Sequence, residues 1–291
     1  MPSQGPNAVD ETRLNQSAEN DTSLRALIDE LEWYHTVEVR PGLITPGWFD
    51  TRGLPERLPF PSSMTGMRCL DIGTFDGFWA FEMERRGADE VTAVDVLDPL
   101  GWDWPAGSEP AVADALNRRK RGGAGFRVLR DAFGSKVMQL ERSVYDLDPK
   151  VDGQFDFVYL GSLLLHLRDP VGALARVRSV TRGQLLVMDA IDLPLSVLLP
   201  RRPVAYLDAV GRPWWWRSNQ AALARMLQAA GFELARAPQR VLVAPGPAHP
   251  RPALGDRRTW RALLHRVGRE TVFAARFGAP HSALLARPAA G

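Results

Sequence analysis

The chain lacks the features that mark several classes of protein. Its single cysteine, Cys69, excludes a disulfide within the chain and a cysteine-rich zinc site. It has no run of about 18 apolar residues, the length that a membrane-spanning helix needs. The first residues carry neither the basic nor the apolar region of a signal peptide. We therefore expect a cytoplasmic protein that does not partner a membrane.

Lysine is also scarce, and its absence is uneven. The chain holds only three lysines, and none follows residue 200, where 15 arginines face four acidic residues. Such a basic third could face an anionic substrate or RNA. It could equally reflect a GC-rich genome that uses arginine as its ordinary cation. We favour the second interpretation, because no arginine run is interleaved with aromatic residues.

The remaining composition is that of a folded protein. Of 291 residues, 45% are hydrophobic and 24% are charged, which excludes a wholly disordered or fibrous chain. The polar residues 1–20 predict a disordered tail. Residues 21–66 predict an N-terminal lid segment of a helix, a short strand at 33–40 and a long ordered loop. Residues 67–291 predict one domain, with insertions at about 190–217 and 245–270.

Strands and helices alternate within that domain. Apolar runs predict five strands, and two further candidates follow near the C-terminus. The predicted strands are 68–73, 90–96, 136–140, 155–160, 184–189, 232–237 and 281–287. Alternation of this kind indicates an α/β fold: a doubly wound, Rossmann-like, seven-stranded and mostly parallel sheet. Ligands of such sheets bind at the carboxyl ends of the strands.

A nucleoside site is indicated by LDIGTFDGF at residues 70–78. Gly73 and Gly77 flank a turn between a strand and a helix, and Asp95 ends the next strand about twenty residues on. No GK[ST] follows, so the turn is not a P-loop. The acid Asp71 would repel a pyrophosphate but suits a cationic, phosphate-free nucleoside such as S-adenosylmethionine (SAM).

Residues 67–189 resemble a class I SAM-dependent methyltransferase on these motifs. The resemblance implies that Asp71 and Gly73 hold the methionine moiety, Asp95 the ribose, and the SVYDL segment the adenine. The implied cofactor-binding residues are Asp71, Gly73, Thr74, Phe75, Gly77, Asp95, Ser143, Val144 and Gly161. The sequence departs from the family at Ser143, where an aspartate is common, and at Phe75, where a glycine is usual.

Further motifs resemble one branch of these enzymes. They are WYHTVEV and TPGWFD upstream, GTFDGFWAFEMERRGA at the donor loop, and SLLLHLRDP after the fourth strand. The branch comprises proteins like the wobble-uridine tRNA carboxymethyltransferases and their actinobacterial relatives, many of which methylate small molecules. This pattern does not fix the substrate.

Three residues are candidate catalytic groups. Methyl transfer from a sulfonium needs mainly positioning, and a general base helps when the acceptor is a hydroxyl or an acidic carbon. His166 follows the fourth strand, and His35 shares its strand side with apolar residues. Asp189, at the end of the fifth strand, could orient either histidine or bind an amine. Each could instead be structural: a packed histidine or a turn-forming aspartate. No cluster has metal-ligand spacing, so we expect no metal.

The leading hypothesis is a SAM-dependent methyltransferase of a small organic acceptor in secondary metabolism. Aromatic loops support it, above all Trp214, Trp215 and Trp216, which could wall a pocket for a flat acceptor or else pack in the core. The alternative is a tRNA wobble-uridine (carboxy)methyltransferase. A carboxylated donor would need a cation, for which Arg212 and Arg217 are candidates. A third class is a SAM-binding protein without catalysis.

Overall fold

The computed structural model describes residues 21–107, 110–208, 213–251, 261, 264 and 266–290. Residues 21–29 are helical. The strands are β1 (Trp33–His35), β2 (Glu38–Arg40), β3 (Leu43–Ile44), β4 (Gly47–Asp50), β5 (Arg68–Ile72), β6 (Glu90–Asp95), β7 (Met138–Glu141), β8 (Phe155–Gly161), β9 (Thr181–Ala190), β10 (Ala205–Leu207), β11 (Trp216–Ser218), β12 (Phe232–Leu234), β13 (Gln239–Pro245) and β14 (Ala279–Pro288). The α-helices are α2 (Phe78–Arg85), α3 (Pro110–Lys120), α4 (Ala124–Phe133), α5 (Pro149–Asp152), α6 (Pro170–Val180), α7 (Leu193–Leu198), α8 (Gln220–Ala229) and α10 (Arg266–Phe277).

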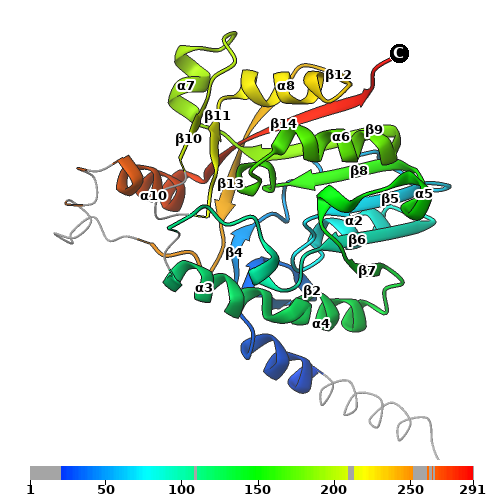
Figure 1. Cartoon of the computed structure of the whole chain (residues 1–291). Helices are drawn as coiled ribbons and strands as arrows, with labels where there is room; N and C mark the ends of the chain where they lie inside the picture. Colours follow the sequence, from blue (N-terminus) through cyan, green and yellow to red (C-terminus); the bar gives the residue numbers. More distant parts are fainter. Residues whose placement is uncertain are drawn as a thin grey trace, which may run out of the picture.

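The central sheet contains ten strands (Figure 1). Its order is β1-β4-β13-β14-β9-β8-β5-β6-β7, and β12 also pairs with β14. Strands β9, β8, β5, β6 and β7 are mutually parallel, whereas β14 runs antiparallel to β9. β12 and β13 both pair antiparallel with β14. β12 lies within the sixth predicted strand, whereas β13 follows it and was not predicted. The doubly wound, Rossmann-like α/β fold expected from the sequence is confirmed.

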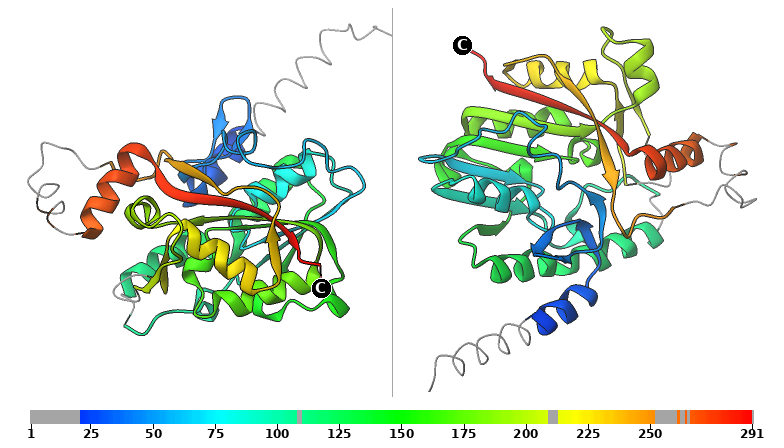
Figure 2. Two further views of the ribbon diagram at one scale, coloured as in Figure 1. Left: turned by 90° about the horizontal axis from the view of Figure 1, so that it is seen from above. Right: turned by 180° about the vertical axis from the view of Figure 1, so that it is seen from behind.

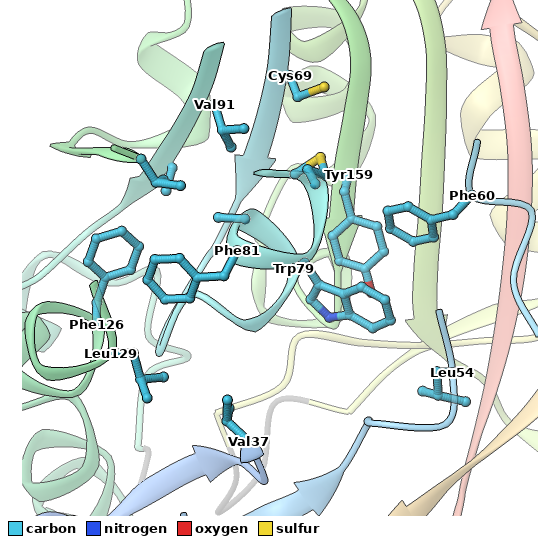
Figure 3. Close-up of a cluster of buried hydrophobic side chains, with 14 of the residues drawn as sticks. Val37, Leu54, Phe60, Cys69, Trp79, Phe81, Val91, Phe126, Leu129 and Tyr159 are labelled. Carbon is cyan, nitrogen blue, oxygen red and sulfur yellow. The ribbon is translucent and has the colours of Figure 1, made fainter. Parts of the chain in front are cut away.

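Both faces of the sheet are covered, because successive side chains of its buried strands point to opposite sides. In β8, Phe157 and Tyr159 join a cluster with Trp79 and Phe81 of α2 (Figure 3). Val158 and Leu160 join a second cluster, which includes residues of α6 and α8. Figure 2 shows the same division, with α6 and α8 on one side of the sheet and α2 on the other. Each element therefore stands where its apolar face is buried.

Two local expectations need correction. The segment at 33–40 is not one strand but two, β1 and β2. Residues 41–66, expected as a loop, contain β3 and β4, and β4 joins the central sheet by pairing with β13. Strand pairing, which no local pattern reveals, accounts for both differences.

The domain boundaries predicted from the sequence stay predictions. The expected disordered tail, residues 1–20, and much of the expected insertion at 245–270 lie outside the described residues. Within the described part, β1 and β4 extend the sheet past β13 (blue and orange in Figures 1 and 2). Segment 21–66 is therefore attached to the domain by main-chain pairing.

Gly47 permits that attachment. A Cβ at this position would overlap the main chain of His35 and Thr36 in the neighbouring strand. Gly53, in the following turn, has open space around the same position. Close backbone approach therefore requires glycine at residue 47 but not at residue 53.

We expect Gly47→Ala to lower the free energy of unfolding by about 1–3 kcal/mol, the usual cost of overpacking. Gly53→Ala is the matched control and should stay within about 0.5 kcal/mol of the wild type. Urea denaturation followed by tryptophan fluorescence measures both. Equal stability of the two variants would contradict the close packing of β1 on β4.

Candidate active site

A cavity of about 530 Å³ opens along the carboxyl edge of the parallel strands. Its walls come from both ends of the sheet. Residues from β5, β6 and the segment after β7 line one end: Gly73, Phe75, Val94, Asp95, Val96, Ser143, Val144 and Tyr145. Residues from β1, β4, β8, β9, β13 and β14 line the other: Tyr34, His35, Phe49, Tyr159, Gly161, Ser162, Met188, Val243 and His281. We call these the nucleoside end and the acceptor end.

The donor loop takes its shape from two residues with positive φ. Gly73 has a φ of 75°, and Phe75 has a φ of 51°, which a non-glycine residue seldom adopts. The amide of Phe75 donates to Oδ2 of Asp95 at 2.8 Å. A carboxylate at the end of β6 therefore fixes the loop that follows β5. The expected departure at Phe75 is accommodated by this strained backbone.

Asp95 also binds a buried lysine that the sequence analysis did not single out. Lys120, at the end of α3, forms an ion pair with Oδ2 of Asp95 and lies 4.6 Å above the ring of Phe75. The Lys120 side chain is only 1% exposed. Both contacts of Asp95 fall on Oδ2, so Oδ1 faces no hydrogen-bond donor among the described residues. That oxygen can accept from a ribose hydroxyl.

Ser143 and Val144 stand beside Asp95 on the cavity wall. The main-chain amide of Arg142 donates to the carbonyl of Asp95, which ties this segment to β6. Oγ of Ser143 accepts weakly from the Tyr145 amide at 3.3 Å, and Val144 is buried. The segment thus offers a hydroxyl and an apolar surface, which suit the edge and face of a flat base.

Three of the predicted cofactor residues lie behind the cavity wall rather than on it. Asp71 and Thr74 are buried, and burial raises the pKa of Asp71 to about 7. Gly77 precedes α2 with a φ of 88°, and a Cβ there would overlap the rings of Phe81 and Phe126. These residues shape the donor loop from behind. Gly73, Phe75, Asp95, Ser143, Val144 and Gly161 all line the cavity.

Asp76 ties the N-terminal strand to the donor loop. Its Oδ2 accepts from the main-chain amides of Tyr34 at 2.7 Å and His35 at 2.8 Å. The carboxyl is buried, which raises its pKa to about 7, although these two hydrogen bonds act in the opposite direction. A residue forty positions upstream is thereby held over the cavity. The sequence shows Asp76 within the motif but gives no sign of this partner.

Tyr34 bridges the two ends of the cavity. Its ring lies 4.8 Å from that of Phe75 and 5.4 Å from that of Phe49, measured between centroids. His35 beside it stacks on Phe78 at 5.7 Å. Its Nδ1 has no hydrogen-bond partner among the described residues, and burial lowers the pKa of His35 to about 3. The predicted His35 therefore lines the cavity as a neutral imidazole.

His166 and Asp189 take different places. His166 lines the cavity, and its Nδ1 lies 2.6 Å from the carbonyl of Pro213. Because a carbonyl can only accept a hydrogen bond, Nδ1 of His166 donates to it. Asp189 lies behind the wall, where Oδ2 accepts from the amides of Leu163 at 3.0 Å and Leu164 at 2.7 Å. Asp189 thus holds the turn that presents His166 and touches neither histidine by a hydrogen bond.

The turn after β8 and the start of β14 supply a hydrogen-bonded pair that sequence reasoning missed. Oγ of Ser162 lies 3.1 Å from Nε2 of His281, and both residues line the cavity. Nδ1 of His281 lies 2.9 Å from the carbonyl of Ala279. Ser162 has a φ of 49°, so it shares with Phe75 a strained backbone at the cavity wall.

An aromatic loop covers the nucleoside end. Trp102, Asp103 and Trp104 line the cavity there. Oδ2 of Asp103 accepts from the Arg168 amide at 2.6 Å, and its carbonyl accepts from the indole of Trp215. Trp215 therefore secures the covering loop. Of the three consecutive tryptophans, none lines the cavity.

The comparisons with known proteins agree with this geometry. The profile of a family described as the methyltransferase domain matches residues 51–237. The tRNA U34 carboxymethyltransferase of Pseudomonas aeruginosa is 28% identical over 185 residues, or 62% of this chain and 49% of that protein. The chain thus spans about half the length of the relatives it matches.

Two solved structures are similar across nearly the whole chain. The N-terminal domain of EvdMO1, in the presence of S-adenosylhomocysteine (SAH) and D-fucose, is 15% identical with a TM-score of 0.50, covering 94% of this chain and 97% of that one. The 1,6-didemethyltoxoflavin-N1-methyltransferase of Burkholderia thailandensis is 18% identical with a TM-score of 0.48, covering 100% and 93%.

The fold and the motif-bearing cavity define a Rossmann-like enzyme of the methyltransferase class. The chain belongs to the methyltransferase domain family, since the profile matches more than half of it. In the part of the chain that the structure describes, no helix is long and apolar enough to cross a membrane. The same residues include no group of three or more histidine, cysteine or acidic side chains arranged to hold a metal ion.

We expect Asp76 to make the free energy of unfolding fall as the pH rises from about 4 to about 7. Its pKa is about 7 in the folded protein against an ordinary 3.8, so in this window the folded state keeps a proton that the unfolded state has released. One such group changes the unfolding free energy by at most about 1.4 kcal/mol per pH unit. Asp76→Asn should remove this contribution, so its stability relative to the wild type should rise with pH.

Urea denaturation at several pH values measures the difference, in which the other titrating groups cancel. Asp131→Asn is the control, because the Asp131 side chain is 75% exposed. Its curve should run parallel to that of the wild type. A parallel curve for Asp76→Asn would show that the carboxyl does not titrate as its burial requires.

Proposed function

We propose that the chain transfers a methyl group from SAM to a small organic acceptor. The observation that carries the proposal is one cavity with two chemically different ends. The nucleoside end presents Asp95 and an apolar wall, and the acceptor end combines aromatic and aliphatic side chains with the polar groups of His35, Ser162 and His281. A volume of about 530 Å³ is within the range of small-molecule sites.

The residues at the nucleoside end fit a cationic nucleoside. Asp95 offers Oδ1 to a ribose, and Val96, Val144 and Trp102 give an apolar slot for a base. Lys120 is already paired with Oδ2 of Asp95, so it does not provide a binding site for a phosphate. SAM supplies an activated methyl group, and the chain's own task is to align the acceptor with it and to exclude water.

The acceptor end fits a flat or apolar molecule. Trp79 and Tyr159 stack at 4.5 Å between centroids, and Phe49 and Tyr34 face them from the N-terminal strands. The hydroxyl of Tyr159 is buried without a hydrogen-bond partner among the described residues. Aromatic walls with few polar atoms favour a small organic acceptor over a polar one. His35 and His166 remain candidate contacts to it.

The second candidate is a tRNA wobble-uridine enzyme that uses a carboxylated donor. Its support is the similarity to the Pseudomonas aeruginosa carboxymethyltransferase, which covers 49% of that protein. A carboxylated donor needs a cation, yet the cations lining the cavity are already paired: Arg142 with Asp152 and Arg168 with Asp103. Arg217 pairs with Glu270, and Arg212 lies outside the described residues. The charge pattern therefore favours SAM itself.

Calorimetric titration should show that SAM and SAH bind the wild type and that Asp95→Ala weakens both by about 30- to 1000-fold, or about 2–4 kcal/mol. The loss follows because the ribose hydroxyls lose a charged acceptor. Asp95→Asn tests the same contact while it fills the space beside Lys120. Asp131→Ala should bind like the wild type.

Absence of SAM and SAH binding to the wild type would overturn the proposed function. Tight binding of tRNA whose affinity falls steeply with salt would favour the second candidate, because neutralised phosphates release counterions. Affinity for tRNA that is weak and shows the same salt slope for unrelated RNA would count against it.

A further inference from the structure

We propose that Ser162 and His281 form the proton-accepting pair of the active site, and that the acceptor is therefore a hydroxyl-bearing, ring-containing molecule methylated on oxygen. This inference rests on the proposed function. It adds to that function the atom that is methylated and the two residues that remove its proton.

Ser162 stands at the carboxyl end of the central strand β8. It follows Gly161, the last residue of β8, and the amide of Ser162 donates to the carbonyl of Met188 at 2.8 Å. Asp189 binds the next two amides. The chain therefore holds a serine in a conformation that L-residues rarely adopt, with a φ of 49°. In a parallel sheet this central strand end lies beside the bound ligand.

The two ring nitrogens of His281 make hydrogen bonds of opposite direction. The carbonyl of Ala279 can only accept, so Nδ1 of His281 carries the ring proton in the neutral form. Nε2 then has a free electron pair, and the Ser162 hydroxyl donates to it across 3.1 Å. A serine whose proton points at a histidine offers its own oxygen as an acceptor to a third group in the cavity.

The surroundings of His281 suit a sulfonium neighbour. The side chain is buried, and burial together with the charge of Arg217 lowers its pKa to about 4. A neutral imidazole does not repel a cationic donor. The hydrogen bond from Nδ1 to the Ala279 carbonyl acts on the pKa of His281 in the opposite direction, and it holds the Nδ1 proton of the imidazolium that forms when the proton is transferred.

The proposed step balances. The acceptor oxygen bonds to the methyl carbon as the carbon–sulfur bond breaks and its electron pair stays on sulfur. The acceptor's proton moves to Oγ of Ser162 as the serine's own proton moves to Nε2 of His281. A neutral alcohol or phenol, a sulfonium and a neutral imidazole give a neutral ether, a thioether and an imidazolium, so the charge is +1 on both sides.

The other histidines on the wall fit this role less well. Nδ1 of His35 has no hydrogen-bond partner among the described residues, so no carbonyl holds a proton there as the Ala279 carbonyl does for His281. His166 donates to Pro213 but contacts no hydroxyl that could relay a proton. Burial raises the pKa of Tyr34 to about 12, so its hydroxyl keeps its proton and does not act as the base. An amine acceptor, which attacks with its own electron pair, would need none of this.

The test uses two phenols that differ in acidity. Phenol keeps its proton at about pH 8.5, since its pKa is about 10 like that of a tyrosine side chain. 4-Nitrophenol is largely ionised there and needs no base. Transfer of labelled methyl from SAM is measured for the wild type, Ser162→Ala and His281→Gln. We expect both variants to lose roughly 100- to 10,000-fold in kcat/KM for phenol, and only a few-fold for 4-nitrophenol.

Matched controls separate this loss from damage to the fold. Ser282→Ala removes the adjacent buried hydroxyl, which contacts Gln220 instead of the cavity. His249→Gln removes a buried histidine that packs on Trp48 and does not line the cavity. Both should methylate the two phenols like the wild type. Calorimetry should show unchanged SAH affinity for all four variants.

A second readout needs no turnover. With SAH bound, the visible band of the phenolate reports whether bound 4-nitrophenol is ionised. At a pH below the pKa of free 4-nitrophenol, the wild type should hold more of the bound phenol as phenolate than His281→Gln does.

Several results would overturn the proposal. Equal losses for the two phenols would reduce Ser162 and His281 to structural residues. A loss confined to phenol in His166→Gln, with His281→Gln active, would move the base to His166. Transfer to aniline but to neither phenol, or to no hydroxyl probe although SAM binds, would reject the hydroxyl acceptor. Failure to bind SAM at all would instead reject the proposed function.

Discussion

The architecture of the site depends on one carboxylate, that of Asp76. It accepts two main-chain hydrogen bonds from Tyr34 and His35, and so joins the N-terminal strand to the loop that follows β5. β1 also pairs with β4, and β4 pairs with β13. The hydrogen bonds to Asp76 therefore connect the edge of the sheet that contains β1 to the loop after the central strand β5. Both ends of the cavity therefore share one rigid frame. This connection costs free energy because it buries the carboxyl of Asp76, and the same burial raises the pKa of that carboxyl.

The charges around the donor loop are arranged for a cation. Asp95 lies close enough to Asp71 and to Asp76 for its charge to raise the pKa of each, and the charge of Lys120 partly offsets this effect. Burial raises the pKa of Asp71 and Asp76 to about 7, so they are partly protonated near neutrality. A sulfonium would favour their ionised forms. Ligand charge and loop structure are thus coupled through the same acids.

Local patterns in the sequence predict the five parallel strands and the donor loop well. An apolar run with an acid near its end marks both β5 and β6, a glycine follows β5, and both strands lead to residues on the cavity wall. The same patterns do not tell a residue on the wall from one behind it. Asp71 and Asp189 end strands and still face the protein interior, because alternate residues of a strand point to opposite sides. Which side meets the ligand is set by the helices packed on each face.

His281 shows why the rest could not be predicted. A search for functional residues at the carboxyl ends of strands passes over β14, since His281 lies near its beginning. This strand runs antiparallel to β9, and His281 pairs with Ala190 at the end of β9. Its first residues therefore stand on the same edge as the last residues of the parallel strands. In a sheet with one reversed strand, the residues that complete a site at this edge come from the start of that strand, and only the observed pairing identifies them.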